Sequence, residues 1–270
     1  MENFLSVDPA SPILLFDSGV GGLTVYDALR ELLPDAPVIY AADLAGLPYG
    51  SKTEAQIAAR VAGLLGRMAE RYQPRLACIA CNTASTIALG MVRDVLEIPV
   101  VGTVPAIKPA AALTQTGIIG LVGTEATIRQ AYVDDLEARF AQDKRLLRVA
   151  APGLVAAAEA KLRGAPVDPA LIADVHTRLS ELAGGSEIDT LVLACTHFPL
   201  LGPELAAAFG QQVRQVDGAQ GIARRIAHLL DGQSFAPASP ARFVVTGPVT
   251  GAEGLEGALA ARGFGPAEAF

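Results

Sequence analysis

Short apolar runs alternate with longer amphipathic stretches along this chain, and this alternation limits the folds open to it. Residues 12–16, 76–80 and 190–194 are almost wholly apolar over about five residues, the length of a buried strand. Between such runs, stretches such as residues 53–72 repeat apolar side chains at helical spacing. Strands that are apolar on both faces and alternate with helices are typical of parallel sheets covered by helices. The pattern therefore predicts an α/β fold.

The same pattern places the elements. We expect strands over residues 12–16, 37–41, 76–80, 99–101, 117–122, 146–150, 190–194 and 242–246. The clearest helices cover residues 23–33 and 53–72, and Thr53 with Gln56 fits a capping box at the start of the second.

Composition excludes several classes of protein. The chain has 270 residues, of which 51% are hydrophobic and 18% charged, so it is long enough and apolar enough to bury a core. The net charge is −7 and basic residues cluster no further than pairs such as Arg224-Arg225, so we expect no nucleic-acid binding. No run reaches the ~18 apolar residues of a membrane span. With no signal-peptide pattern and three cysteines, too few for a disulfide framework, we expect a cytoplasmic protein without membrane contact.

Ligands of parallel α/β sheets bind at the carboxyl ends of the strands, so the polar residues that directly follow each strand are the candidates for function. In this chain they are Asp17 and Ser18, Asp43, Cys81 to Thr83, Thr103, Thr124, and Cys195 to His197.

Two of the three cysteines occupy similar sequence positions. LACIACNT at 76–83 and LVLACTH at 191–197 each place Ala-Cys at the end of an apolar strand. The echo is either a chance similarity of buried strands or the mark of two similar halves. A thiol at a helix N-terminus has its thiolate favoured by free backbone N–H groups, which applies to Cys81 and, by the same argument, to Cys195. Cys78 lies inside its strand and is expected to be a core residue, so a redox or metal C-x-x-C is not favoured.

Asp17 opens a glycine-rich turn, residues 17–22, that lacks both the dinucleotide-binding spacing and a phosphate-loop lysine. Such a turn can cradle an anion, or Asp17 can simply cap the following helix. His197, two residues after Cys195, is suited to tune that thiol, and a Cys–His hydrolase is a competing interpretation. In the loop of residues 47–52, Tyr49 and Gly50 either bind a carboxylate or form an ordinary turn.

Five motifs together resemble glutamate racemase, of the aspartate/glutamate racemase family. They are FDSGVGGLTV at 16–25, LPYGSKT at 47–53, ACNTAS at 80–85, PAIKPA at 105–110 and ACTHFPLL at 194–201, and the similarity extends over residues 13–247. The resemblance implies two similar doubly wound α/β domains with mainly parallel sheets and an active site in the interdomain cleft. We expect the first domain to comprise residues 1–105 plus 220–270 and the second residues 106–219.

The resemblance also implies an activity: interconversion of L- and D-glutamate without a cofactor or metal, supplying D-glutamate for peptidoglycan, by a homodimer. Racemisation removes the α-proton from one face and returns a proton to the other, so two groups must flank the α-carbon. By family analogy Cys81 serves the D-isomer and Cys195 the L-isomer. Asp17 and His197 correspond to supporting acid/base groups, and Glu159 to a glutamate that assists the histidine. The positions that correspond to substrate contacts are Asp17, Ser18, Tyr49, Gly50, Asn82, Thr83, Thr124, Thr127, Thr196 and His197.

Some positions depart from the family pattern. Ala194 stands where glycine is common, and residues 41–46 replace the commoner Gly-Asp-Thr-Ala-Arg before Pro-Tyr-Gly, which puts the fit of the Tyr49 loop in question. About twelve residues precede the first strand, so we expect no activation by a cell-wall precursor. The alternatives are a related racemase of aspartate or hydantoins, and a non-catalytic binding or inhibitory protein on the same fold, for example one that acts on DNA gyrase.

Overall fold

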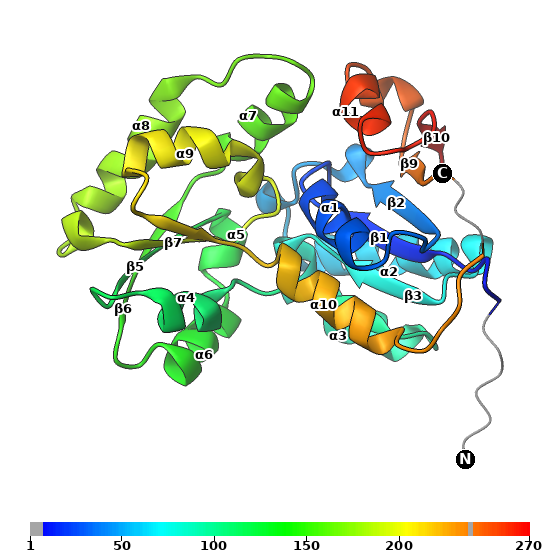
Figure 1. The fold of residues 1–270 in the computed structure, drawn as a ribbon, viewed down its shortest axis with the longest axis horizontal. Coiled ribbons are helices and arrows are strands. Elements are labelled where there is room, and N and C mark those ends of the chain that lie inside the picture. Colours follow the sequence, from blue (N-terminus) through cyan, green and yellow to red (C-terminus); the bar gives the residue numbers. More distant parts are fainter. Residues whose placement is uncertain (1–7, 237–239) are drawn as a thin grey trace.

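All the strand pairs in the computed structural model, which describes residues 8–236 and 240–270, are parallel. They form two separate sheets, one of six strands in the order β10-β9-β2-β1-β3-β4 and one of four in the order β6-β5-β7-β8. Figure 1 shows the two sheets side by side, each with its own helices. The predicted α/β fold with two doubly wound parallel domains is confirmed.

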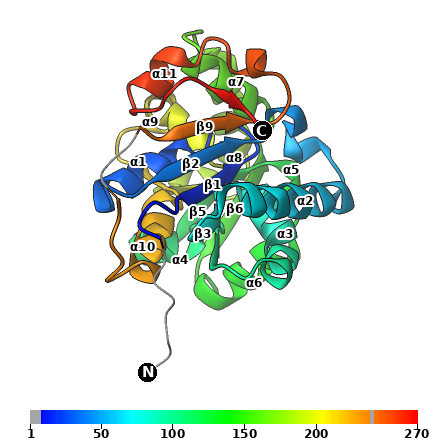
Figure 2. The same ribbon diagram turned by 90° about the vertical axis from the view of Figure 1, so that its right-hand side faces the viewer.

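The six-stranded sheet belongs to the first domain. Side chains of β1 alternate between its faces: Ile13 and Leu15 pack on one side against α1 and α10, and Leu14 and Phe16 on the other against α2 and α3. In Figure 2 these helices lie on either side of the sheet. The strands are β1 (Ile13–Asp17), β2 (Val38–Ala42), β3 (Leu76–Ile79), β4 (Val100–Gly102), β9 (Arg242–Val245) and β10 (Glu268–Ala269), and the helices are α1 (Leu23–Leu32), α2 (Glu54–Tyr72), α3 (Asn82–Val95), α10 (Ala219–Leu229) and α11 (Glu256–Ala260).

The four-stranded sheet of the second domain is also covered on both faces. Leu191 and Leu193 pack with α7, α8 and α9, whereas Val192 and Ala194 pack with α4 and α6. The strands are β5 (Ile118–Gly123), β6 (Arg145–Ala150), β7 (Thr190–Leu193) and β8 (Arg214–Val216), and the helices are α4 (Ile107–Leu113), α5 (Glu125–Ile128), α6 (Ala131–Phe140), α7 (Gly153–Leu162), α8 (Pro169–Ser180) and α9 (Gly202–Phe209).

The two sheets share one strand order. The first strand of each is central, the second lies on one side of it, and the third and fourth lie on the other, so that β2-β1-β3-β4 matches β6-β5-β7-β8. The segment after β3 is therefore equivalent to the segment after β7. Cys81 and Cys195 occupy these two segments, so the echo between their motifs reflects equivalent positions in two similar halves.

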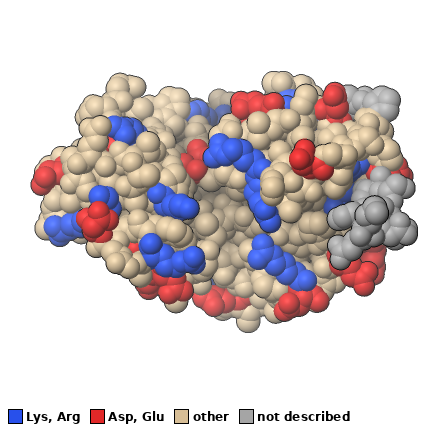
Figure 3. Space-filling model, turned by 60° about the horizontal axis from the view of Figure 1, so that its bottom comes forward, with Lys and Arg blue, Asp and Glu red and all other residues tan. Residues whose placement is uncertain are grey.

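The chain passes from the first domain to the second between β4 and α4 and returns between β8 and α10. Both connections line a groove of about 710 Å³, together with basic side chains that include Lys108, Arg139, Arg224 and Arg225. Figure 3 shows the face that holds this groove, where Lys and Arg side chains stand apart from one another around a central hollow. Within the described ranges, no helix is both long enough and apolar enough to cross a bilayer.

The observed elements follow the expected ones within one residue at most ends. The helix expected over residues 23–33 ends at Leu32, and Leu33 caps it. Two strands were missed, β8 and β10. Both are short outer strands, of three and two residues, with too few apolar side chains to give a pattern, because backbone pairing with a single neighbour is what defines them.

The capping box of α2 gives a first prediction. The Thr53 hydroxyl accepts a hydrogen bond from the Gln56 amide at 3.3 Å, and Gln56 Oε1 accepts one from the Thr53 amide at 3.0 Å. Thr53→Ala should lower the free energy of unfolding in urea by about 1 kcal/mol. The Gln56 N–H group loses its acceptor, and the reciprocal hydrogen bond of the capping box is no longer supported. The matched control is Thr177→Ala, an exposed threonine within α8. Equal unfolding midpoints for the two variants would contradict the assignment.

Candidate active site

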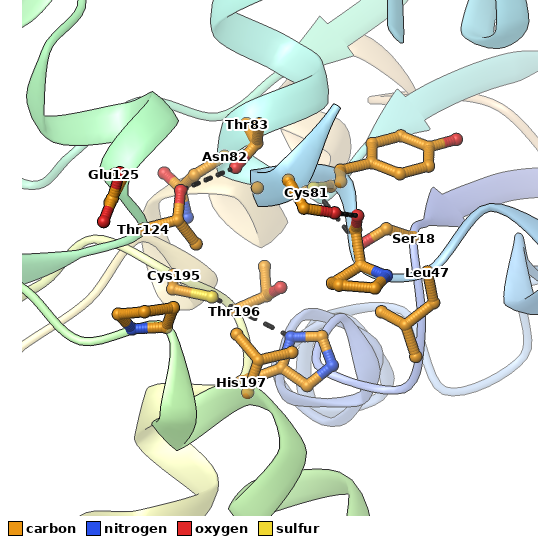
Figure 4. Close-up of a pocket in the computed structure, with 16 residues that line it drawn as sticks. Ser18, Leu47, Cys81, Asn82, Thr83, Thr124, Glu125, Cys195, Thr196 and His197 are labelled. Atoms are coloured by element: carbon orange, nitrogen blue, oxygen red, sulfur yellow. Dashed lines mark hydrogen bonds between the residues drawn. The ribbon is translucent and has the colours of Figure 1, made fainter. Parts of the chain in front are cut away.

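The carboxyl ends of both sheets meet at a cavity of about 280 Å³ between the domains (Figure 4). The segments after β1, β2 and β3 enter it from the first domain, and those after β5, β6 and β7 from the second. Among the lining residues, all within the described ranges, there is no Lys or Arg. The lining consists of Ser18, Leu47, Pro48, Tyr49, Gly50, Ser51, Cys81, Asn82, Thr83, Thr124, Glu125, Pro152, Val155, Cys195, Thr196 and His197.

Cys81 enters the cavity as the N-cap of α3. Its Sγ accepts a hydrogen bond from the Ala84 amide at 3.5 Å and lies 3.5 Å from the Ser18 hydroxyl. Burial, together with the nearby Asp17 carboxylate, raises the pKa of Cys81 to about 12. Cys78, on the opposite face of the sheet, is fully buried in the core, as expected.

Cys195 has a different partner. The expectation that it, too, begins a helix is wrong: a 3-10 turn, Phe198–Leu201, follows it, and α9 starts only at Gly202. Thr196 instead donates a hydrogen bond to Asp17 of the first domain. His197 Nδ1 lies 3.8 Å from Cys195 Sγ, so an imidazole takes the place of the helix terminus. Figure 4 shows this pair on the side of the cavity opposite Ser18.

His197 and Glu159 form a buried pair behind Cys195. His197 Nε2 is 2.8 Å from Glu159 Oε1, and the other carboxylate oxygen accepts a hydrogen bond from Arg163 at 2.6 Å. Burial alone would lower the pKa of His197, but its contacts with Cys195 and Glu159 raise that pKa well above its usual value. Burial alone would raise the pKa of Glu159, but hydrogen bonds from His197 and Arg163 lower it to about 2. The geometry thus places a cation beside Cys195, whereas Cys81 has the Asp17 carboxylate nearby.

The glycine-rich turn binds the carboxylate of Glu159, an anion from the protein itself. The Val20 amide donates to Glu159 Oε1 at 2.9 Å. A Cβ on Gly21 would lie 2.6 Å from the backbone nitrogen of His197, so glycine there allows the second domain to approach. Asp17 does not cap the next helix, because the N-cap of α1 is Gly22, which makes no side-chain cap bond.

Asp17 is instead a buried acceptor at the domain boundary. The Gly19 amide donates to its Oδ1 at 2.8 Å, and the Thr196 hydroxyl of the second domain donates to its Oδ2 at 2.9 Å. Burial raises the pKa of Asp17 despite the opposing effect of His197. The Ser18 hydroxyl stands between this carboxylate, at 3.4 Å, and Cys81 Sγ.

Polar groups on the remaining wall come from both domains. The hydroxyls of Thr83, Thr124 and Thr127 lie 3.0 to 3.2 Å from one another, although Thr127 is behind the cavity wall. Asn82 Oδ1 is buried and has no hydrogen-bond partner in the described part of the chain. The Tyr49 hydroxyl does not face a ligand, because it donates to Asp43 at 2.5 Å.

Sequence reasoning missed part of the lining. Ser51 and Glu125 directly follow the predicted site residues Gly50 and Thr124. Pro152 and Val155 follow β6, and their side chains have no polar atoms that would mark them as candidates. Arg60, which contacts Asp43 from α2, gives no signal in the sequence. In the described ranges no three His, Cys, Asp or Glu side chains converge as a metal site requires.

The chain is similar in sequence and in structure to known proteins. Residues 20–226 match the model for Asp/Glu/Hydantoin racemase. The glutamate racemase of Sphingopyxis alaskensis is 64% identical over 227 residues, which are 84% of this chain and 85% of that protein. The crystal structure of Escherichia coli glutamate racemase with L-glutamate and the activator UDP-MurNAc-ala has a TM-score of 0.89 at 42% identity, and covers 96% of this chain and 98% of its own. Glutamate racemase isoform RacE1 from Bacillus anthracis has a TM-score of 0.82 at 26% identity, with 97% and 98% covered.

The close approach at the glycine-rich turn is testable. Gly21→Ala should lower the free energy of unfolding by about 1–3 kcal/mol, because the added methyl group overlaps the backbone of His197. Gly63→Ala is the matched control: it lies on α2 with open space around it, and should raise stability by about 0.5–1 kcal/mol. Urea denaturation measures both, and a neutral Gly21→Ala would show that the domains do not approach this closely.

The Glu159–His197 pair should make stability depend on pH. Because the pKa of Glu159 falls from its usual 4.5 to about 2, its carboxylate stabilises the fold above pH 4.5, and this stabilisation disappears as the pH falls through about 2. The raised pKa of His197 keeps its share in place below pH 6.5. At pH 5.5, Glu159→Gln should therefore cost on the order of 3 kcal/mol of unfolding free energy, and less at each lower pH.

The control for this titration is Glu187→Gln, an exposed glutamate near β7. At pH 5.5 its unfolding free energy should lie within about 0.5 kcal/mol of that of the unmodified chain, because substitutions of exposed side chains have small effects. A Glu159→Gln deficit that stayed constant from pH 5.5 to pH 2.5 would exclude an ionised Glu159 as its source.

Proposed function

The chain belongs to the Asp/Glu/hydantoin racemase family and is an amino-acid racemase, and we propose that its substrate is glutamate and that Cys81 and Cys195 are its two bases. The product, D-glutamate, would serve peptidoglycan synthesis. The observation that carries the proposal is the placement of two thiols at equivalent positions of two similar sheets, both lining one cavity.

A substrate held between the thiols presents one face of its α-carbon to each. The thiolate on one side removes the α-proton, and the electron pair of the broken C–H bond remains on the α-carbon next to the carboxylate. The thiol on the other side then donates its proton to the opposite face and becomes the thiolate. The protein ends with the two protonation states exchanged, so the reverse reaction restores them.

The surroundings of the two thiols suit these alternating roles. His197, beside Cys195, can stabilise negative charge on that sulfur and is itself held by Glu159. Ser18 connects Cys81 with Asp17, so a proton at Cys81 has a hydrogen-bonded acceptor nearby. We assign Cys81 to the D-isomer and Cys195 to the L-isomer, as the family resemblance implies.

The remaining lining fits an amino acid with a second carboxylate. Asn82 Oδ1, a buried acceptor that has no partner among the described residues, suits the substrate ammonium group, because leaving it unpaired costs roughly 1–3 kcal/mol. Hydroxyls such as those of Thr83 and Thr124 and the backbone amides near Gly50 suit carboxylates. The Escherichia coli relative was crystallised with L-glutamate, which supports the same substrate here.

The proposal is tested by following the circular dichroism of L-glutamate without added pyridoxal phosphate. The unmodified protein should racemise it, and Cys81→Ser and Cys195→Ser should each lower turnover by at least about 100-fold, because each removes one proton carrier. Cys78→Ala should leave turnover unchanged, since that thiol is buried in the core of the first domain.

Parallel reactions with aspartate and a hydantoin distinguish substrates within the family. If aspartate or the hydantoin is turned over faster than glutamate, that compound is the substrate, and the two-thiol mechanism still applies. Full activity in one of the two cysteine-to-serine variants would instead exclude that mechanism.

A further inference from the structure

A second cluster of buried charge lies behind the cavity wall, centred on Asp43. This residue follows β2 directly, is fully buried and does not line the cavity. Its two carboxylate oxygens accept hydrogen bonds from Tyr49 at 2.5 Å, from Thr246, and from Arg60 through Nε at 2.5 Å and Nη2 at 2.6 Å. Although burial would raise the pKa of Asp43, these hydrogen bonds lower it. The carboxylate is therefore ionised and satisfied on both oxygens.

The donors come from three separate parts of the first domain. Arg60 projects from α2, Thr246 follows β9, and Tyr49 belongs to a 3-10 turn, Tyr49–Ser51. This turn and the preceding Leu47 and Pro48 form one wall of the cavity. Asp43 thus ties the wall to two fixed elements of the domain.

The contact between Arg60 and Asp43 requires a glycine at position 46. A Cβ at Gly46 would overlap the Asp43 carboxylate and lie 2.6 Å from Arg60 Nε, so the ion pair of Asp43 and Arg60 occupies the space that any side chain at position 46 would need. Arg60 makes two parallel bonds to the carboxylate, a geometry that lysine cannot reproduce. Glycine at 46 and arginine at 60 are therefore complementary.

The position of the wall determines the width of the cavity. A Cβ on Gly50 would lie 3.3 Å from Cβ of Thr124, which is part of the second domain. A small shift of the turn would therefore alter the space between two groups that face the ligand. Neither Cys81 nor Cys195 lies on this turn, so such a shift affects ligand binding more directly than proton transfer.

We infer that Arg60 is a positioning residue for the substrate, and that it acts through Asp43 and Tyr49 to hold the turn of residues 49–51 at its place in the cavity. This inference rests on the proposed racemisation of glutamate for its kinetic readout. It assigns a function to a side chain that does not line the cavity and would not touch the substrate.

The test compares Arg60→Gln, Arg60→Lys and the control Arg67→Gln. Arg67 is exposed on the same helix, and its guanidinium packs over the ring of Phe270. For Arg60→Gln we expect KM for both enantiomers to rise about tenfold or more while kcat falls less, because a displaced wall weakens binding. Arg60→Lys should recover part of this loss. Arg67→Gln should match the unmodified chain.

A merely structural role would have another signature. Loss of folded protein lowers apparent kcat and leaves KM unchanged, because the molecules that remain folded bind normally. An Arg60→Gln protein with KM within about twofold of the unmodified value would overturn the inference. If that variant does not fold, the same comparison is made with Arg60→Lys, which keeps the positive charge.

A double-mutant cycle with Tyr49→Phe tests the route through Asp43. If Arg60 acts through the Asp43–Tyr49 contact, the loss of kcat/KM in Arg60→Gln/Tyr49→Phe should be smaller than the product of the two single losses. If the double variant instead loses kcat/KM by the full product of the two single losses, Arg60 does not act through the Asp43–Tyr49 contact.

Calorimetric titration with D-glutamate separates this inference from the proposed reaction. Absence of racemisation in the unmodified protein, with glutamate still bound, would exclude the reaction alone. The dissociation constant of Arg60→Gln should then still be about tenfold higher, and an unchanged constant would exclude the role of Arg60.

Discussion

The contact between the glycine-rich turn of the first domain and the Glu159–His197 pair of the second is the interaction on which the site depends. The Val20 amide binds the Glu159 carboxylate, and the absence of a side chain at Gly21 lets the backbone of His197 approach. Without this close approach, the carboxyl ends of the two sheets would not enclose one cavity. Because the buried carboxylate has its charge partners in His197 and Arg163, burial there does not leave an isolated charge.

The same contact makes two equivalent thiols unequal. Cys81 and Cys195 follow corresponding strands of two sheets with the same order, yet Cys81 caps a helix near Asp17 and Cys195 lies beside His197. Each thiol has an acid or base of its own, Asp17 through Ser18 on one side and His197 on the other. A reaction that needs one protonated and one ionised sulfur at a time is suited to such a difference.

Two layers of polar side chains surround the cavity. The cavity lining, taken from the described residues, contains no Lys or Arg, and its basic side chain is His197, which stands beside hydroxyls, Asn82, Glu125 and the two thiols. A basic side chain, Arg60, lies one layer further out, where it neutralises Asp43 and fixes the wall that contains Tyr49. This arrangement keeps the Arg60 guanidinium out of the cavity while it holds the wall in place.

The sequence by itself determined the layered α/β fold, since the apolar runs of β1, β3 and β7 indicate strands buried on both faces. It also located Asp17, Cys81 and His197, because each lies at the carboxyl end of a strand or within four residues after it. It could not show which residues meet across the domains. The partner of the glycine-rich turn, the replacement of a helix terminus by His197 at Cys195, and the bond that takes the Tyr49 hydroxyl away from the cavity all join segments far apart in the chain. Local patterns record the burial and periodicity of one element, whereas these contacts follow from how two sheets are packed against each other, and so only the tertiary structure decided them.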